Sequence, residues 1–332
     1  GIERATQLLH EALEAQVPIL IVGDFDADGA TSAALMVKGL TALGAQNVGY
    51  LVPNRFEFGY GLSPQIVEVA LRQKPSLLVT VDNGITSVDG VALARANGVQ
   101  VIVTDHHLPG AELPDADAIV NPNLAGDEFP SKNLAGVGVA FYLLVALRAR
   151  LRDRGWFDAA GIKPANLAEL LDLVALGTVA DVVPLDRNNR ILVAQGLVRI
   201  RAGRCRPGIR ALLTAGGRTV ERAVASDLGF AAGPRLNAAG RLTDMSLGVE
   251  CLLSDTEEAA GQMASELQAL NLTRREIEAD MSEEALSQVD AMTQSSAPPP
   301  ALALFKEDWH PGVVGIVASR VKDRVHRPVV AF

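Results

Sequence analysis

Short, continuously apolar runs alternate with amphipathic segments over the first 125 residues of the chain. The runs are rich in Val, Ile and Leu, and most segments between them are long enough for a helix. Strands of a parallel sheet are covered on both faces and are therefore apolar throughout, so this alternation predicts βαβ units and a parallel sheet. The predicted strands are residues 18–23, 48–52, 77–81, 99–104 and 118–120, and the predicted helices are residues 31–43, 63–72 and 87–97.

From residue 134 onward the pattern becomes mainly helical. Residues 256 to about 292 contain neither Gly nor Pro after Gly261 and are rich in Glu, Ala, Leu and Gln, which indicates one long connecting helix. The other predicted helices of this region are residues 134–152, 165–179, 189–201, 209–215 and 246–253.

Residues 294–300 (QSSAPPP) have the composition of a linker. Two predicted strands, residues 301–305 and 328–332, and a predicted helix, residues 312–323, follow it. We therefore expect an α/β domain over residues 1–253 with a helical part from about 134, a connector helix over 254–293, and a second, smaller α/β domain from 294. Because the last residues resemble the middle of a strand, we expect this second domain to be truncated at the C-terminus and the chain to be part of a longer protein.

Composition narrows the class of protein. With 332 residues, 48% of them apolar and 21% charged, the chain predicts more than one ordered domain. Its two Cys residues cannot form a disulfide framework, and no apolar run reaches the ~18 residues of a membrane span. Charged residues near the start leave no apolar signal segment, so we expect a cytoplasmic protein. Aromatic residues are only 4% of the chain, so any surface that stacks on nucleobases must depend on few of them.

Candidate metal ligands follow three of the predicted strands. Because the carboxyl ends of parallel strands meet at one edge of the sheet, we expect these side chains to lie close together. Unpaired carboxylates in so small a volume repel one another, and a cation relieves that repulsion. An oxygen-rich ligand set with one or two imidazoles suits Mn²⁺ or Mg²⁺ better than Zn²⁺. The residues are Asp24, Asp26 and Asp28 after the first strand, Asp82 after the third, and His106 and His107 after the fourth.

Each of these motifs has a simpler interpretation when taken alone. The sequence DADG also occurs in EF-hand loops, but the twelfth position counted from Asp24 is Leu35, where such a loop needs a bidentate Glu. The Asp-Asn-Gly run at Asp82 is by itself most often a turn. Asp181 ends an apolar helix, where a carboxylate either caps the helix or binds a metal, and the residues alone leave both roles open.

Taken in order, the motifs GDFDADGATS, VDNG, TDHH and GTVADVVPL resemble those of the DHH phosphoesterase family. Further stretches are similar to the bacterial single-stranded-DNA-specific exonucleases of that family, and the resemblance runs from Gly1 to Phe332. By this resemblance the chain would continue through the rest of a DHHA1 domain and an OB-fold. The further stretches are residues 51–63, 121–123, 134–141, 233–242 and 309–320.

The resemblance implies a two-metal site and assigns roles to single residues. Asp82 would bridge the two ions, Asp28, His106 and Asp181 would complete one site, and Asp24 and Asp26 would serve the other, although the division among the three carboxylates of the first motif stays open. His107 would lie near the scissile phosphate as a hydrogen-bond donor or acid, so the implied catalytic residues are Asp82, His106 and His107. The implied substrate-binding residues are Arg55, Tyr60, Arg235 and Asn237.

The resemblance also implies an activity: a metal-dependent 5′→3′ exonuclease that releases 5′-mononucleotides from single-stranded DNA in recombination and repair. Such an enzyme would work beside a helicase and a single-strand-binding protein. A phosphodiesterase of the same family acting on short oligonucleotides or cyclic dinucleotides is the alternative, and a non-catalytic DNA-binding scaffold is the third interpretation. No GxxxxGK[ST] motif is present, so we expect no need for ATP.

The charge of the chain is unevenly distributed. The whole chain carries a formal charge of −9, which alone would argue against a nucleic-acid partner. Residues 187–241, however, contain eleven Arg against only Glu221 and Asp227. This density favours a basic surface along a nucleic-acid backbone, although any one Arg could belong to a solvated helix face.

Overall fold

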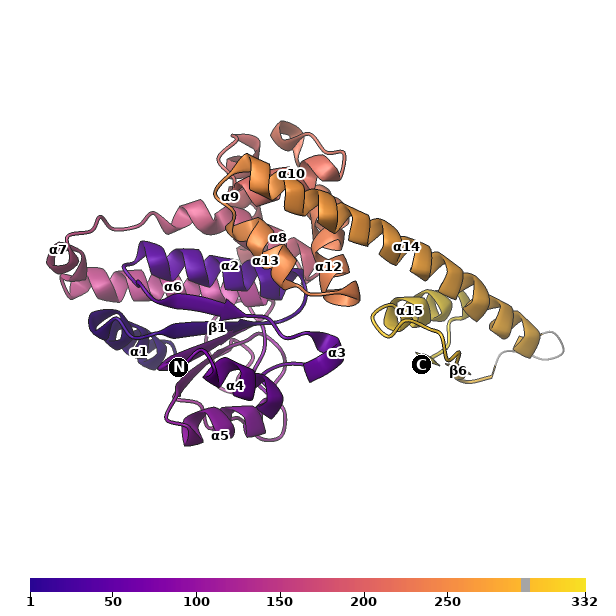
Figure 1. The fold of residues 1–332 in the computed structure, drawn as a ribbon, viewed down its shortest axis with the longest axis horizontal. Helices are drawn as coiled ribbons and strands as arrows, with labels where there is room; N and C mark the ends of the chain where they lie inside the picture. The colour runs from indigo at the N-terminus through magenta and orange to yellow at the C-terminus, as the bar shows by residue number, and fades with distance from the viewer. Residues whose placement is uncertain (294–298) are drawn as a thin grey trace.

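The computed structural model describes residues 1–293 and 299–332. Most of the predicted linker, residues 294–300, therefore lies outside the described residues. A sheet-containing body holds residues 1–253, and the long helix α14 (Glu257–Thr293) leads from it to a smaller α/β part (Figure 1). The mixed α/β class with a parallel sheet and a long connecting helix is confirmed.

The central sheet has five parallel strands in the order β2-β1-β3-β4-β5. Gly23 pairs with Val81 and Val81 with Thr104, so three neighbouring strands end at the same level. The residues that follow them emerge side by side at the carboxyl edge. The strands are β1 (Ile19–Gly23), β2 (Val48–Leu51), β3 (Leu77–Val81), β4 (Gln100–Thr104) and β5 (Ala118–Val120), each within one residue of its predicted bounds.

Helices cover both faces of this sheet. Ile19 and Ile21 of β1 belong to the larger hydrophobic cluster, and Leu20 and Val22 belong to a second cluster on the opposite face. Strands that are buried on both faces read as uninterrupted apolar runs, which is why their bounds could be predicted. The larger cluster includes α1 (Ile2–Ala15), α2 (Ala27–Ala42) and α6 (Gly136–Asp153), and the second includes α4 (Pro64–Leu71) and α5 (Val88–Ala96).

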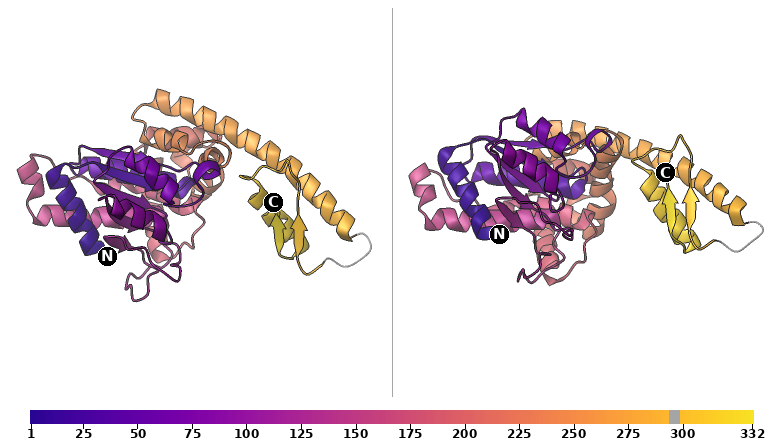
Figure 2. Two further views of the ribbon diagram at one scale, coloured as in Figure 1. Left: turned by 60° about the horizontal axis from the view of Figure 1, so that its bottom comes forward. Right: turned by 90° about the horizontal axis from the view of Figure 1, so that it is seen from below.

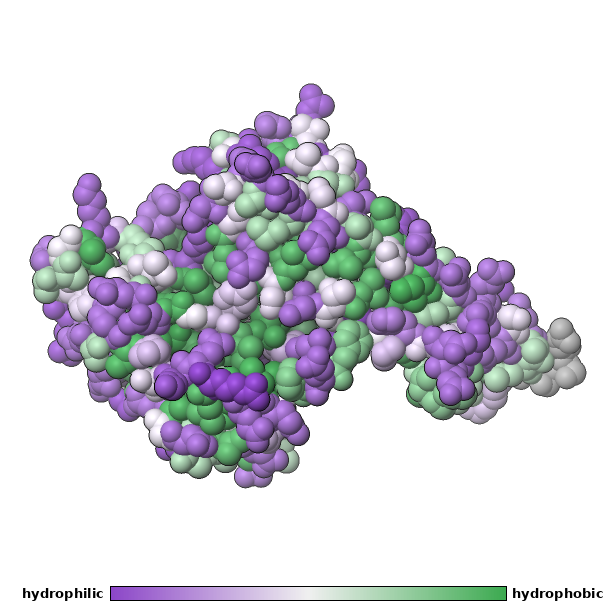
Figure 3. Space-filling view, in the orientation of Figure 1, coloured by the Kyte–Doolittle hydropathy of each residue, from purple (hydrophilic) through white to green (hydrophobic). Residues whose placement is uncertain are grey.

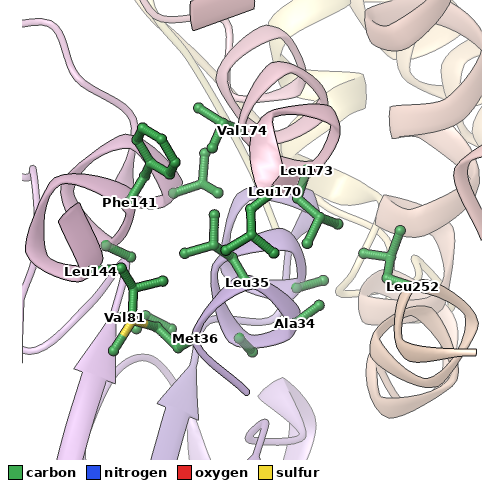
Figure 4. Packing of buried hydrophobic residues seen from close by; sticks show 14 of the residues in the cluster. Ala34, Leu35, Met36, Val81, Phe141, Leu144, Leu170, Leu173, Val174 and Leu252 are labelled. Atoms are coloured by element: carbon green, nitrogen blue, oxygen red, sulfur yellow. The ribbon is translucent and has the colours of Figure 1, made fainter. Parts of the chain in front are cut away.

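Helix α8 (Leu171–Ala180) forms the centre of the helical part. Every residue from Leu171 to Thr178 is buried, because α2 packs on one side of the helix and α9 (Arg187–Arg201) on another. Leu35 of α2 lies among Leu173 and Val174 of α8 and Phe141 of α6 (Figure 4). The apolar packing of α2 and α8 brings the ends of both helices to the carboxyl edge of the sheet.

Shorter helical segments complete this part, and several of them were not predicted. A π-helical turn, Leu228–Ala232, runs directly into α12 (Gly233–Leu242). The remaining segments are α3 (Arg55–Phe58), α7 (Trp156–Ala160), a 3₁₀ turn at Leu167–Leu170, α10 (Pro207–Ala215), a 3₁₀ turn at Val220–Arg222, α11 (Ala225–Asp227) and α13 (Ser246–Leu253).

The smaller part packs on the far half of α14. Its strands β6 (Leu302–Leu304) and β7 (Val329–Ala331) pair in parallel, and α15 (Val314–Val325) covers them. The near half of α14 packs on α10, α12 and α13 of the large body. Two further views show the helix extending between both parts (Figure 2), and the space-filling view shows a notch between them (Figure 3).

Two contacts bridge the parts away from α14. The guanidinium of Arg241 donates a hydrogen bond to the carbonyl of Gly312 at 3.0 Å, and the ring of His310 meets Phe56 edge-to-face at 5.8 Å between centroids. Among the helices that the structure describes, none is both long and apolar enough to cross a membrane.

Candidate metal centre

The loop between β1 and α2 places three carboxylates at the carboxyl edge of the sheet. Asp26 is the N-cap of α2, and its side chain accepts a hydrogen bond from the Gly29 N–H at 2.9 Å. Asp24 and Asp28 are buried on either side of it. Asp26 thus fixes where α2 starts, and the start of α2 in turn fixes the positions of Asp24 and Asp28.

Asp28 is fixed by a second helix. Its carboxylate accepts hydrogen bonds from the N–H groups of Gly136 at 2.6 Å and Val137 at 3.0 Å, at the start of α6. The partial positive charge of a helix N-terminus stabilises a carboxylate there. A Cβ on Gly136 would lie 2.5 Å from the Cβ of Asp82, so only glycine allows the start of α6 to approach both carboxylates.

Asp82 occupies an unusual backbone conformation directly after β3. Its φ is 63°, in the left-handed region that Asp and Asn tolerate better than other residues with a side chain. Asn83 stabilises this turn, because its amide donates to the carbonyls of Val22 and Val81 and so joins β1 to β3. The turn directs the buried Asp82 carboxylate toward the candidate ligands from the neighbouring strands.

One carboxylate oxygen of Asp82, one of Asp181 and the Nε2 of His106 are buried close together and have no hydrogen-bond partner. His106 Nε2 lies 3.1 Å from Asp82 Oδ1 and 3.6 Å from Asp181 Oδ2, and none of the three atoms takes part in a hydrogen bond within the described chain. Buried polar atoms are normally paired, so unpaired ones that face each other call for a ligand. A divalent cation that accepts carboxylate oxygen and imidazole nitrogen fits this set.

The described residues contain three overlapping groups of candidate metal ligands. Within each group, the ligand atoms all lie within 4.8 Å of one another. Two of the groups, Asp28–His106–Asp181 and Asp24–Asp26–Asp82, follow the division between two ions that the resemblance implies. The third group joins Asp82 and His106 to His107. All six expected ligands are therefore brought together, and Asp181 carries an unpaired side-chain oxygen, as a ligand does.

Burial and mutual repulsion make this cluster hold protons when no cation is present. Burial, with the charge of Asp26 in addition, raises the pKa of Asp24 and of Asp28 to about 7. Burial, then repulsion by Asp28, raises the pKa of Asp181 to about 7, and the same causes raise the pKa of Asp82 well above its usual range. A bound cation would compete directly with these protons.

His107 takes part in a different set of contacts. Its Nδ1 lies 2.7 Å from the buried carboxylate of Asp105, and this hydrogen bond raises the pKa of His107. Asn121 and Asn123 donate side-chain hydrogen bonds to the carbonyls of His107 and His106, at 2.9 and 2.6 Å. The imidazole is therefore held in one orientation and favoured in its protonated form, as a proton donor requires.

Two of the four expected substrate residues lie at the rim of this centre. The Arg55 guanidinium lies 4.0 Å from the centroid of the Phe25 ring, and the charges of Asp24 and Asp26 act on it. The Tyr60 hydroxyl is 3.4 Å from His107 Nδ1, and its ring remains half exposed.

The other two expected residues make internal contacts. Asn237 accepts a hydrogen bond from the Ala27 N–H at 2.8 Å, so α12 supports the loop that carries Asp26 and Asp28. Arg235 is only 8% exposed and donates to the carbonyl of Ala231 at 2.6 Å, while its Nε has no partner. Both residues thus have supporting roles in addition to any contact with substrate.

Several residues that shape the centre lie in stretches that the sequence analysis quoted but to which it gave no role. Asp105 precedes the two histidines, Asn121 follows β5, and Gly136 begins α6. Asp105 and Asn121 also stand at the carboxyl ends of strands, so the same rule that selected the ligands could have included them. The contact of Gly136 with the centre depends on a helix packing that carries no local sequence signal.

The chain is similar to a known family and to characterised proteins. The family model described as "DHH family, N-terminal domain" matches residues 18–178. The single-stranded-DNA-specific exonuclease RecJ of Salmonella typhimurium is 63% identical over the whole chain, which covers 58% of that protein.

Solved structures give the same relationship. A crystal structure of exonuclease RecJ bound to manganese matches with a TM-score of 0.86 and 40% identity, over 100% of this chain and 79% of that one. A structure of RecJ from Thermus thermophilus in complex with Mg²⁺ matches with a TM-score of 0.73 and 35% identity, over 99% of this chain and 42% of that one. The chain thus spans somewhat more than half the length of the curated relative from Salmonella.

Proposed function

The chain belongs to the DHH family, and on that premise we propose that it is a 5′→3′ exonuclease that hydrolyses phosphodiester bonds of single-stranded DNA and releases 5′-mononucleotides in recombination and repair. The observation that carries this proposal is the set of unpaired buried atoms of Asp82, His106 and Asp181 at the edge of the sheet. RecJ proteins at up to 63% identity, and RecJ structures with Mn²⁺ or Mg²⁺, support it.

Two ions, Mn²⁺ or Mg²⁺, would be held by the two ligand groups. Asp28, His106 and Asp181 would hold one ion, Asp24 and Asp26 would hold the other, and Asp82 would bridge them. A pair of such ions supplies charge for the attacking and leaving oxygens of an in-line displacement and lowers the pKa of bound water. The carboxylates neutralise the ions and fix their positions, so no side chain has to form a covalent bond to phosphorus.

The remaining side chains position the substrate and move a proton. His107, kept protonated by Asp105, would donate a proton to the 3′ oxygen that leaves when the P–O bond breaks. Arg55 would contact the phosphate oxygens, since a guanidinium offers paired donors to a phosphate. Tyr60 lies beside His107 and would orient the same phosphate.

A polymer substrate is favoured over a dinucleotide by the basic helical part. Besides the eleven Arg of residues 187–241, Arg274 and Arg275 of α14 lie near this region, because they act on the pKa of Arg241 and Arg235 respectively. Guanidinium groups that lie near one another, as those of Arg218, Arg235 and Arg275 do, suit successive phosphates of one strand. The alternative remains a DHH phosphodiesterase for short oligonucleotides or cyclic dinucleotides.

The organisation of the protein is part of this proposal. Residues 1–253 would form the catalytic domain, residues 254–293 the connector, and residues 294 onward the start of a DHHA1 domain. The strand would pass between the two domains, where the space-filling view shows a notch (Figure 3). We also propose a cytoplasmic location, with a helicase and a single-strand-binding protein as partners.

The test is a single substitution at the bridging ligand. Asp82→Asn removes the charge but retains a residue that tolerates the left-handed backbone. With Mn²⁺ and labelled single-stranded DNA, the wild type should release mononucleotides, and the variant should be at least about 100-fold slower. Asp89→Asn, at an exposed position of α5, is the matched control and should keep full activity. Equal activity of Asp82→Asn and wild type would refute the assignment, and cleavage of dinucleotides without release from polymer would favour the alternative.

A further inference from the structure

Phe230 is exposed to an unusual degree. Its side chain is 81% exposed, more than any other Phe, Tyr or Trp that the structure describes. The chain has only nine Phe, three Tyr and two Trp residues, and both Trp side chains are largely covered. A large aromatic side chain left in water, in a protein that has few of them, points to a ligand that covers it.

The backbone around Phe230 fixes this exposure. The residue lies in the π-helical turn Leu228–Ala232, and such turns are rare and occur frequently at functional sites. Leu228, Ala231 and Ala232 of the same turn are buried. Because its neighbours are anchored in the core, the outward position of Phe230 belongs to the fold and is not a feature of a loose loop.

The π-helical turn packs against the end of α8 that carries Asp181. A Cβ built on Gly229 would lie 3.2 Å from the side chain of Val179, and one built on Gly233 would lie 3.0 Å from that of Ala180. Both contacts are within two residues of the candidate metal ligand. The turn that carries the exposed Phe230 therefore packs on the end of α8 that bears Asp181.

Val182, directly after Asp181, adds a second exposed apolar group at that end of α8. It is 85% exposed and has a φ of 63°, a left-handed conformation that a β-branched residue rarely adopts. Strained backbone of this kind concentrates at functional sites. Here it turns an apolar side chain toward solvent beside the metal centre.

The other side of Phe230 is basic. The next residue, Ala231, accepts a hydrogen bond from the guanidinium of Arg235 at 2.6 Å. After burial, the positive charges of Arg218 and Arg275 lower the pKa of Arg235, so three like charges gather there. Arg218 also pairs with Asp227 at 3.1 Å, which leaves Arg235 and Arg275 as the positive charges nearest the turn that could meet a phosphate of the strand.

We propose that Phe230, with Val182 on the neighbouring segment, is a stacking platform for a nucleobase of the single-stranded substrate. This inference rests on the proposed function and names how the same site holds its substrate. Every base has a π face, so stacking is tolerant of sequence, and a base already stacked inside a duplex cannot use the platform. The platform would therefore contribute to strand preference as well as to affinity.

Binding is measured separately from cleavage. The protein in EDTA is titrated into two 3′-fluorescein 16-mers, one with bases and one abasic throughout, and anisotropy gives the Kd. Phe230→Ala should weaken binding of the normal 16-mer about 5- to 100-fold and leave binding of the abasic 16-mer unchanged. Phe230→Trp should restore binding, and Val198→Ala, which removes an exposed apolar side chain from α9, should have no effect.

Each outcome separates the two proposals. Equal Kd values for wild type and Phe230→Ala on the normal 16-mer, or equal weakening on both 16-mers, would overturn the platform while exonuclease activity of the wild type stands. A wild type that binds through Phe230 but cleaves no DNA with Mn²⁺ would keep the platform and overturn the proposed function. Failure of Phe230→Trp to restore binding would assign Phe230 a purely structural role.

Discussion

Three buried carboxylates, Asp24, Asp28 and Asp82, and the partly buried Asp181 make the stability of the metal-free protein depend on pH. Asp24, Asp28 and Asp181 each have a pKa raised by burial to about 7 from 3.8, and burial also raises the pKa of Asp82 well above 3.8. A raised folded-state pKa means that stability is fully present below pH 3.8 and is lost as the pH rises through 7. His106, whose pKa is lowered by burial, acts in the opposite direction, but it is one group against four.

The magnitude follows from linkage. Between about pH 5 and pH 7 a carboxyl of this kind is protonated in the folded state and ionised in the unfolded state, so stability falls by about 1.4 kcal/mol per pH unit. One such carboxyl therefore costs about 3 kcal/mol between pH 5 and pH 8, and the four carboxyls together cost more. Mn²⁺ replaces the protons, so the stabilisation that it gives should grow over the same interval.

The assay is urea unfolding at about pH 5, 6, 7 and 8, with EDTA and with Mn²⁺. Without metal the unfolding free energy should decrease over this range, and Asp181→Asn should remove about one carboxyl's share of the decrease. Asp89→Asn, exposed on α5, should retain the wild-type slope. Stability in EDTA that is constant or rises from pH 5 to pH 8 would contradict the burial of these carboxylates.

Two further predictions concern packing and charge. Gly136→Ala places a Cβ 2.5 Å from the Cβ of Asp82. Calorimetry should therefore show that the variant binds Mn²⁺ at least about 10-fold more weakly and that its free energy of unfolding is lower by about 1–3 kcal/mol. Gly261→Ala, which has open space around it in α14, should be neutral or stabilising. Despite a net charge of −9, affinity for single-stranded DNA should fall by a factor of at least about 10 between 50 and 200 mM salt in an anisotropy titration, and an affinity independent of salt would exclude the basic region as the binding surface.

The strands and the ligand positions were predictable for the same physical reason. A strand buried on both faces is apolar without interruption, so its last residue is visible in the sequence, and β3 and β5 have the predicted bounds. The rule that parallel strands end at one edge then selected the ligands. Helix α12 and the π-helical turn were not predicted as helices, because a Pro and several Gly residues obscure the helical pattern and tertiary packing decides their structure.

The supporting contacts of the site were less predictable. Asn237 binds the backbone of Ala27, and Gly136 contacts Asp82, over separations in sequence that no local pattern records. The family resemblance implies that Arg235 binds substrate, and its burial against Ala231 is visible only in the folded chain. The sequence pattern identifies the side chains that can bind metal or move a proton, whereas the folded structure identifies the residues that hold those side chains in place.

The continuous helix α14 has a consequence for how the length of this protein can vary. Each residue inserted into an α-helix advances it by 1.5 Å and rotates everything beyond it by about 100°. One half of α14 packs on α12 and the other on α15, while Phe56 meets His310 and Arg241 reaches Gly312 across the notch. One added residue would turn the far part out of phase with these contacts, and seven would restore the phase but shift it by about 10 Å. The 37 residues of α14 therefore fix the spacing between the two parts, and natural variation in length should fall outside this helix.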